Sequence, residues 1–172
     1  MISYDEWRVA FAKQALADLR AREKLLEHPG LPDCQQLHFL QMACEKLCKA
    51  HLCGQGVDPE ALRSSHAYIS GILPIIARQQ FAQEARKVHA DRTWVIQALR
   101  ALARKIELLA PAVNDGGRQP ANCEYPWAGP DGVVRVPADH NFELDLLHEK
   151  AGRHLLKVVY TGAEELARRQ PA

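Results

Sequence analysis

The sequence has almost no net charge and no long apolar run. Its 22 lysines and arginines nearly balance its 21 aspartates and glutamates. No global field would therefore draw the chain to nucleic acid or to a membrane, and such a partner would need a local patch. No apolar stretch is long enough for a transmembrane helix, and the first residues lack the basic segment and apolar run of a signal peptide. These absences predict a soluble protein of the cytoplasm that makes no membrane contact.

Disulfide bonds and metal sites are not expected from the cysteines. Four of the five lie in or beside one predicted helix and cannot all pair with distant partners, so reduced thiols are predicted. Cys44, Cys48 and His51 share one helical face at spacings that could suit a metal ion. However, cysteine inside a helix core is more often a small apolar residue, and no second cysteine pair at ligand spacing follows. We expect neither a metal nor a cofactor.

One stretch, Leu37 to Leu52, has the pattern of a helix in the middle of a bundle. Its apolar residues form two adjacent rows at helical spacing. A helix with so wide an apolar face needs neighbours on two sides. Glu45 precedes Lys49 by four residues, the favourable order for an ion pair on an exposed helical strip. At 172 residues the chain can bury a core without metal or disulfide bonds, so a single domain over residues 1–172 is expected.

The first two helices have readable boundaries. Ser3 and Glu6 form a capping box, and good helix formers follow as far as Glu27. Asp33 is the expected cap of the central helix, which should end at Cys53.

Further helical segments are predicted downstream. Asp58-Pro59 starts a short helical turn, since proline is tolerated at a first helical position. The helix that carries His66 is expected to kink or break at Pro74. Asp91 is the expected cap of the next helix, whose apolar residues repeat at alternating spacings of four and three. The last helix covers about Leu144 to Arg169.

The chain changes character before the last helix. Residues 114–141 hold eight prolines and glycines, too many for a long helix. Tyr125, Trp127 and three nearby valines argue against disorder, because such side chains are normally buried. A two-stranded ribbon turning at Gly129 to Gly132 fits this composition. The sequence therefore predicts an all-α protein, a four- to five-helix antiparallel bundle with a long, structured Pro/Gly-rich loop at about residues 112–142.

The run HFLQMACEKLCKAHL is followed after a short interval by SHAYISGIL. This pair of segments resembles the HEPN superfamily, the higher eukaryotes and prokaryotes nucleotide-binding helical domains. HEPN domains often carry an alanine-glutamate-lysine-x-x-lysine-alanine signature on the second helix, which Cys44 to Ala50 matches with cysteine for the first alanine. A histidine then starts the third helix, matched by His66, which could hydrogen-bond Glu45 or contact a ligand. The resemblance covers about Ser3 to Leu109 and implies a structural signature of Glu45, Lys49 and His66.

For function, the resemblance implies one of two roles. Many HEPN domains are metal-independent ribonucleases, whose active site is an arginine, four to six residues and then a histidine near the start of the last helix, paired across a homodimer. Others lack that motif and serve as nucleotide-binding or scaffold partners, often beside a nucleotidyltransferase or within toxin–antitoxin and defence systems. Arg135 and His140 have four residues between them and lie just before the last helix. As catalytic residues, His140 would move a proton while an RNA 2′-hydroxyl attacks its own phosphate, and Arg135 would stabilise phosphate charge.

Two residues depart from that motif. Pro137 denies the segment between Arg135 and His140 the helical form that the motif usually has. Phe142 stands where a tyrosine often lies. A solvated arginine and a turn histidine are therefore the alternative interpretation.

A basic surface is the other candidate for nucleic-acid or nucleotide contact. Between Ile76 and Leu109, seven basic residues exceed three acidic ones. The candidates for phosphate contact are Arg86, Arg92, Arg100 and Arg104. A solvated helix face is the alternative. Trp127 could stack on a base or close the open end of the bundle.

Two hypotheses from different classes follow. In the first, the chain is a metal-independent ribonuclease of a toxin–antitoxin or defence system that acts as a homodimer, with Arg135 and His140 in composite sites. In the second, it is a non-catalytic interaction module that pairs with itself or with a partner protein such as a nucleotidyltransferase. Association with RNA or nucleotides is common to both. Whether the arginine and the histidine lie on a helix distinguishes them.

Overall fold

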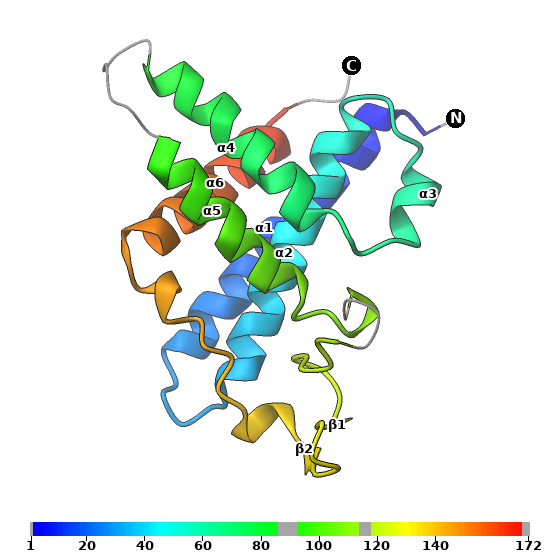
Figure 1. The fold of residues 1–172 in the computed structure, drawn as a ribbon. Coiled ribbons are helices and arrows are strands. Elements are labelled where there is room, and N and C mark those ends of the chain that lie inside the picture. The colour runs from blue at the N-terminus through cyan, green and yellow to red at the C-terminus, as the bar shows by residue number, and fades with distance from the viewer. Residues whose placement is uncertain (1, 86–92, 114–117, 170–172) are drawn as a thin grey trace.

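The computed structural model describes residues 2–85, 93–113 and 118–169. This part of the chain is mostly helical (Figure 1), which confirms the all-α fold class. Its α-helices are α1 (Tyr4–Leu26), α2 (Asp33–Cys53), α3 (Pro59–Arg63), α4 (Ile69–Ala85), α5 (Thr93–Glu107) and α6 (Lys150–Ala167). Single turns of 3-10 helix lie at Pro111–Val113, Pro137–Asp139 and Asp145–Leu147. None of the helices within the described ranges is long and apolar enough to cross a membrane.

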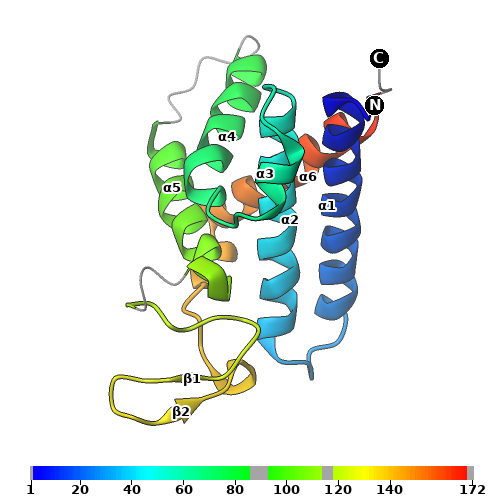
Figure 2. The ribbon, with the colours of Figure 1, turned by 90° about the vertical axis from the view of Figure 1, so that its right-hand side faces the viewer.

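The helix α2 lies in the middle of the bundle, as its two apolar rows predict. It runs antiparallel to α1, and α4 and α5 pack on its other side (Figure 2). The last helix, α6, packs across α1, α2, α4 and α5. Because α2 contacts each of the other α-helices of the described chain, it is the element around which they assemble.

Apolar side chains from every long helix meet in one core. Leu19 of α1, Leu40 and Leu47 of α2, Leu73 of α4 and Leu155 of α6 are fully buried. The predicted apolar row on and just after α5 is also buried throughout, at Val95, Leu99, Leu102, Ile106 and Leu109. Full burial of one such side chain stabilises a fold by about 1.5–3 kcal/mol, so this core holds the helices together.

The capping box at the start of α1 is confirmed, and the cap expected for α2 is wrong. The Ser3 hydroxyl accepts the N–H of Glu6 at 3.2 Å, and the Ser3 N–H donates to the Glu6 carboxylate at 2.6 Å. Before α2, Pro32 holds the cap position without a side-chain hydrogen bond, and Asp33 is the first helical residue. The Asp33 carboxylate still favours the helix there, because it lies at the positive end of the helix dipole. The end of α2 at Cys53 is as predicted.

The expectation for Pro74 is a kink or a break, and the break is wrong because α4 runs through this residue. Proline cannot donate to the carbonyl four residues earlier, which belongs to Ser70 in the first turn of α4, and only that one bond is lost. Leu73, Ile76 and Ala77 on either side of the proline are buried. Their packing keeps the helix continuous.

The remaining helix boundaries agree with the sequence in part. The Asp58 side chain caps α3, which begins as predicted. Asp91, the expected cap of α5, lies outside the described residues. The helix α6 begins at Lys150 rather than near Leu144, because the 3-10 turn at Asp145–Leu147 precedes it and packs against its first turns.

The loop before α6 contains the expected two-stranded ribbon. Strands β1 (Trp127–Ala128) and β2 (Val134–Arg135) pair antiparallel. In the turn between them, the N–H of Gly132 donates to the carbonyl of Gly129 at 3.0 Å, and the φ of +75° at Gly132 favours glycine. The ribbon lies at the end of the bundle opposite to the one at which α1 begins and α6 ends (Figure 1).

Candidate functional site

The loop before β1 is organised by one buried side chain, Asn122. Its Oδ1 accepts the backbone N–H groups of Glu124 and Tyr125 at 2.9 and 2.7 Å. Its Nδ2 donates to the carbonyl oxygens of Pro120 and Tyr125, both at 3.1 Å. The side-chain oxygen of Asn122 thus accepts two hydrogen bonds and its nitrogen donates two, and these four bonds fix the backbone that precedes the ribbon.

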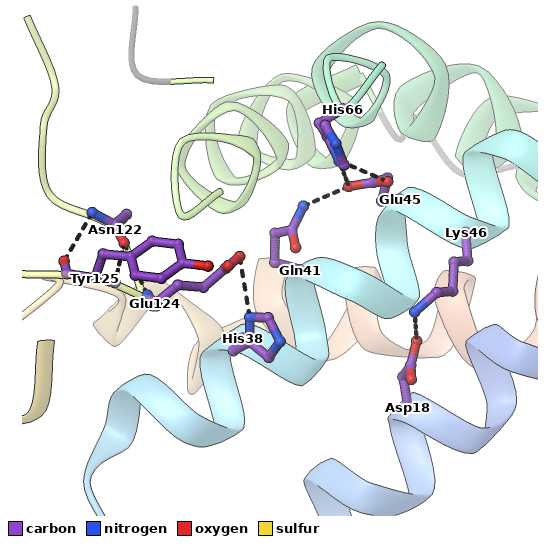
Figure 3. A network of polar contacts seen from close by, with 9 residues as sticks. All are labelled: Asp18, His38, Gln41, Glu45, Lys46, His66, Asn122, Glu124 and Tyr125. Carbon is purple, nitrogen blue, oxygen red and sulfur yellow. Dashed lines mark hydrogen bonds and ion pairs between the residues drawn. The ribbon is translucent and has the colours of Figure 1, made fainter. Parts of the chain in front are cut away.

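Two further contacts tie this loop to the bundle. The N–H of Cys123 donates to the carbonyl of Leu109, just after α5, at 3.0 Å. The Glu124 carboxylate lies 3.6 Å from the Nδ1 atom of His38 on α2 (Figure 3). Sequence reasoning missed the role of Asn122, although an asparagine that bonds the backbone two residues further on is a recognisable turn signal.

Arg135 lies on β2 opposite Trp127 and is held by Asp131. Its Nη1 and Nη2 donate to the two carboxylate oxygens of Asp131 at 2.8 and 2.9 Å. A Cβ atom on Gly129 would fall 1.6 Å from Nη1, so the guanidinium lies directly over the turn. The hydrogen bonds from Arg135 hold the pKa of Asp131 well below its ordinary value, and Asp131 in turn raises the pKa of Arg135. Both groups are therefore charged at neutral pH and paired with each other.

His140 lies in an aromatic cluster beside the ribbon. Its ring centroid is 4.9 Å from that of Trp127 and 4.8 Å from that of Phe142, both edge-on. Trp127, the candidate for base stacking, is half-buried in this cluster. Pro137 opens a 3-10 turn just before His140, so the segment that joins Arg135 to His140 is not α-helical. This is the departure from the HEPN motif that Pro137 indicates in the sequence.

The two predicted catalytic residues do border one surface hollow. Arg135, Asp139 and His140 line a hollow of about 260 Å³. His140 also borders a second hollow of about 350 Å³, between the loop and the end of α5, where Lys105 and Phe142 lie. The structure therefore brings Arg135 and His140 together, but the guanidinium already has a carboxylate partner. The positive charge that a phosphate would need is neutralised in this arrangement.

Apolar side chains are exposed on and beside the ribbon. Four residues around it are well exposed, with exposed fractions of 61%, 55%, 69% and 39%: Tyr125, Val133, Val134 and Val136. We call these four residues the ribbon surface. Residues 118–143 carry two basic and four acidic side chains. Neighbouring exposed apolar residues are typical of interaction sites, whereas an acidic excess is unfavourable for phosphate contact.

Glu45 on α2 is the centre of a buried polar network (Figure 3). Its carboxylate accepts Lys49 Nζ at 2.6 Å and Gln41 Nε2 at 2.9 Å, and both its oxygens lie 3.2 Å from His66 Nδ1. Glu45 and Lys49 are both buried. The expectation of an exposed Glu45–Lys49 pair is therefore wrong, because α2 has neighbours on more of its circumference than its apolar rows indicate. The expected hydrogen bond between His66 and Glu45 is present.

His66 differs in position from its expected counterpart. It lies in the segment between α3 and α4 rather than at the start of a helix, since α4 begins at Ile69. Its ring is half-buried and reaches the Glu45 carboxylate from above α2 in Figure 3. The contact joins this segment to the central helix, which is a structural role.

The predicted basic patch lies only partly within the described residues. Arg86 and Arg92 lie outside them. Arg100 and Arg104 are exposed on α5, and Arg104 Nη1 lies 3.4 Å from the carboxylate of buried Glu107. That carboxylate also accepts two hydrogen bonds from the first turn of α4. Arg104 is thus part of the contact between α4 and α5, which favours a structural interpretation for it.

The thiols are poorly suited to chemistry. All five cysteines are free and buried. Burial raises the pKa of Cys44 to about 12 and that of Cys53 to about 11. The thiolate, which is the reactive and metal-binding form, is therefore disfavoured. Among the described residues, no group of three or more histidine, cysteine, aspartate or glutamate side chains lies where it could hold a metal ion.

Comparison with known proteins adds no family to these observations. No protein-family model matches the chain, and neither a curated protein nor a solved structure matches it. The functional inference therefore depends on the geometry and chemistry of the residues described above.

Proposed function

We propose that this chain is a non-catalytic interaction module, a HEPN-like helical bundle that pairs with itself or with a partner protein through the ribbon surface. The observation that carries the proposal is the bidentate pair between Asp131 and Arg135. A catalytic arginine has to meet the charge that develops on the phosphate. In this loop the guanidinium already meets a carboxylate, so Arg135 shapes the ribbon instead.

The charge of the loop supports a protein partner over RNA. Proteins that bind nucleic-acid backbones neutralise phosphates with lysine and arginine. Residues 118–143 hold more acidic than basic side chains, and one of the two basic ones, Arg135, is paired with Asp131. This surface would repel a phosphate backbone rather than attract it.

The ribbon surface offers a tyrosine and three valines to a partner, with the exposed Asp131–Arg135 pair beside them. Interface cores are enriched in aromatic residues, and charged groups are tolerated at the rim. The hydrogen bonds of Asn122 and the Asp131–Arg135 pair hold the ribbon in shape before a partner arrives. A preordered surface loses less conformational entropy on binding, so a small patch can still bind a partner with useful affinity.

The resemblance to HEPN domains fits this role. It implies that bundles without the catalytic motif act as partners of other proteins, a nucleotidyltransferase among them, in toxin–antitoxin and defence systems. In the proposed role, Glu45, Lys49 and His66 maintain the packing of α2, and the loop before α6 supplies the contact. Association with RNA or nucleotides then belongs to the complex rather than to this chain alone.

The test is the mass of the purified protein in solution, measured by light scattering over a range of concentrations. We expect a wild-type dimer and a monomeric Val133→Ser/Val134→Ser variant, because the variant removes two exposed apolar side chains from the ribbon surface. Ile75→Ser is the matched control, since Ile75 is also an exposed aliphatic residue but lies on α4. It should leave the dimer intact.

If the wild-type chain stays monomeric, pairing with itself is excluded and pairing with a partner protein remains as the proposal. That form is tested by co-purification from the native cell, with the Val133→Ser/Val134→Ser variant in parallel. A partner that binds wild type and the Ile75→Ser variant but not the ribbon variant supports the proposal. Identical partners on all three proteins would exclude the ribbon surface.

A metal-independent ribonuclease is the second candidate, because Arg135, Asp139 and His140 line one hollow. In this reaction the RNA 2′-oxygen attacks the adjacent phosphorus while His140 accepts the hydroxyl proton, and the bond from phosphorus to the 5′-oxygen breaks as that oxygen takes a proton from water. Asp131 would have to release Arg135 when the substrate binds. Incubation with mixed RNA in EDTA tests it. Cleavage that is lost in both Arg135→Ala and His140→Ala supports catalysis, and cleavage that is absent in wild type or unaltered in the variants removes it.

A further inference from the structure

A polar cleft lies at the end of the bundle away from the ribbon. It has a volume of about 230 Å³ and is lined by residues of α1, α2, α4 and α6. In Figure 1 this is the end at which α1 begins and α6 ends. Its apolar lining comes from Leu47, Ile76 and Leu166, and most of the other lining residues have polar side chains. None of the residues that carry the proposed interaction role lines this cleft.

Gly162 keeps the inner part of the cleft open. A Cβ atom on Gly162 would lie 3.0 Å from Gln80 Nε2 and 3.3 Å from both methyl groups of Leu47. In the absence of that atom, the Gln80 amide reaches α6 and donates to the carbonyl of Val158 at 3.1 Å. The Gln80 side chain is thereby held in a fixed position on one wall.

Arg8 of α1 contributes a cation that is mostly buried and incompletely bonded. Its side chain is only 15% exposed and contacts Asp5 through one oxygen at 2.8 Å. Its Nε is a buried polar atom without a hydrogen-bond partner. A guanidinium has five N–H donors, and a buried donor without an acceptor is unfavourable. The wall of the cleft therefore includes a mostly buried cation that a single carboxylate oxygen contacts.

The rest of the wall offers uncharged donors and acceptors and a second arginine. The His51 and Gln55 side chains on and just after α2 lie 2.9 Å apart, and Gln79 belongs to the α4 wall. Burial lowers the pKa of His51, so its ring is neutral at pH 7 and acts as a hydrogen-bonding group rather than as a charge. Arg169 borders the cleft on the side of α6, where Glu165 is the one acidic lining residue.

We propose that this cleft binds a small hydroxylated organic anion, with its carboxylate or phosphate at Arg8 and Arg169 and its hydroxyl groups at the amides and imidazole of the wall. Arg8 meets only one carboxylate oxygen of Asp5, whereas Arg135 meets both oxygens of Asp131. Arg8 and Arg169 outnumber Glu165 in the lining and favour an anion, and the glutamine amides, which both donate and accept, match hydroxyl groups. The volume is below the roughly 300–1,000 Å³ typical of sites for drug-sized ligands. A molecule of the size of a small metabolite is therefore the one that fits.

Binding is tested on the full chain by calorimetry and by the imidazole resonances of His51 in NMR spectra. The probes are glycerol 3-phosphate and malate, which distinguish a phosphate from a carboxylate as the anionic group. We expect at least one probe to shift the His51 resonances. Arg8→Gln and Arg169→Gln should each weaken binding by at least about tenfold, because each removes a charge-assisted hydrogen bond.

Arg168→Gln is the matched control, because Arg168 is the neighbouring residue, pairs with Glu164 and does not line the cleft. It should bind the probe as wild type does. If Arg8→Gln does not fold, Arg169→Gln carries the test, since Arg169 is exposed. The proposal is overturned if neither probe shifts the His51 resonances at millimolar concentration, or if all the arginine variants bind the probe equally.

Discussion

Glu45–Lys49 and Asp131–Arg135 are pairs of the same kind in opposite settings. Each joins a carboxylate to a cation four residues further along the chain, at 2.6 and 2.8 Å. On α2 both side chains are at most 6% exposed, whereas on the ribbon they are 51% and 37% exposed. Spacing therefore sets which groups meet. The free energy of the contact depends instead on how much water the two groups lose.

The two pairs should consequently act on different parts of the molecule. The Glu45 carboxylate also binds Gln41 and His66, so any change to it or to Lys49 leaves unbalanced polar groups in the bundle. The Asp131–Arg135 pair is solvated, and such pairs contribute little to global stability. Its effect is on shape, because it holds the guanidinium over the turn of the ribbon.

The largest expected effect is that of Lys49→Met, which keeps the length of the side chain and removes its charge. Glu45 would remain buried without its cation, and loss of one partner of a buried pair costs about 3–5 kcal/mol in the free energy of unfolding. Urea denaturation followed by circular dichroism measures the change. Lys24→Met is the control, since Lys24 and Glu27 form an exposed pair at the end of α1, and its midpoint should match that of wild type. Equal midpoints for both variants would remove the distinction between the buried and exposed pairs.

Asn122→Ala should cause the next largest loss of stability. It tests whether the buried Asn122, rather than the exposed Asp131–Arg135 pair, keeps the loop before the ribbon ordered. The variant removes four hydrogen bonds of a buried side chain, and an unsatisfied buried group costs about 1–3 kcal/mol. Amide hydrogen exchange at Glu124 and Tyr125 should accelerate by about tenfold or more. Asn141→Ala is the matched control, because the exposed Asn141 side chain accepts a single backbone N–H, from Glu143. Similar exchange in both variants would show that Asn122 is not the organiser of the loop.

The helices and their order could be predicted from the sequence because apolar periodicity reports directly which face of a helix is covered. The row of apolar residues on α5 and the capping box of α1 are examples. The burial of Glu45 and Lys49 could not be predicted in the same way. Their spacing is that of a surface pair, and only the number of helices around α2 determines that water is excluded from them.

The sequence predicts which residues of the candidate site lie close together, but it does not predict which side chain Arg135 contacts. The spacing of Arg135 and His140 places them close together, as they are around one hollow. The partner of Arg135 is Asp131, across a turn whose shape depends on Gly129 and Gly132. That contact forms only once the ribbon exists, so the motif spacing contains no sign that the arginine is already paired.

Asp131→Asn should leave the global unfolding midpoint unchanged, because the pair that it breaks is exposed. Its effect should be local. The Asp131 carboxylate accepts the Val133 N–H at 3.2 Å as well as the guanidinium, so amide exchange at Val133 should accelerate. Asp139→Asn is the control. It also removes one carboxylate charge, at the hollow that Arg135 lines, and it should leave amide exchange at Val133 unaltered. A fall in midpoint as large as that of Lys49→Met would contradict the comparison of the two pairs.

The smallest effect is the pH dependence of the ribbon, and it bears most directly on function. The pKa of Asp131 is depressed chiefly by the hydrogen bonds from Arg135. A depressed pKa stabilises the folded ribbon at all pH values above the ordinary aspartate pKa of about 3.9. That contribution is lost only as the pH falls further, through the lower pKa of the folded form. The Asp131 carboxyl carbon should therefore titrate well below pH 3.9 in NMR spectra of the wild type.

Arg135→Gln separates the two explanations of that titration. If Arg135 is the cause, the variant should return the titration midpoint of Asp131 to near the ordinary aspartate value. Added salt should shift the wild-type midpoint only in part, because salt screens charge attraction more than it disrupts a bidentate hydrogen bond. An Asp131 that titrates normally in the wild type would mean that the pair is open in solution. Arg135 would then be available to a phosphate, and the ribonuclease would become the better proposal. A depressed pKa means that Arg135 is occupied throughout the neutral range, as the proposed interaction module requires.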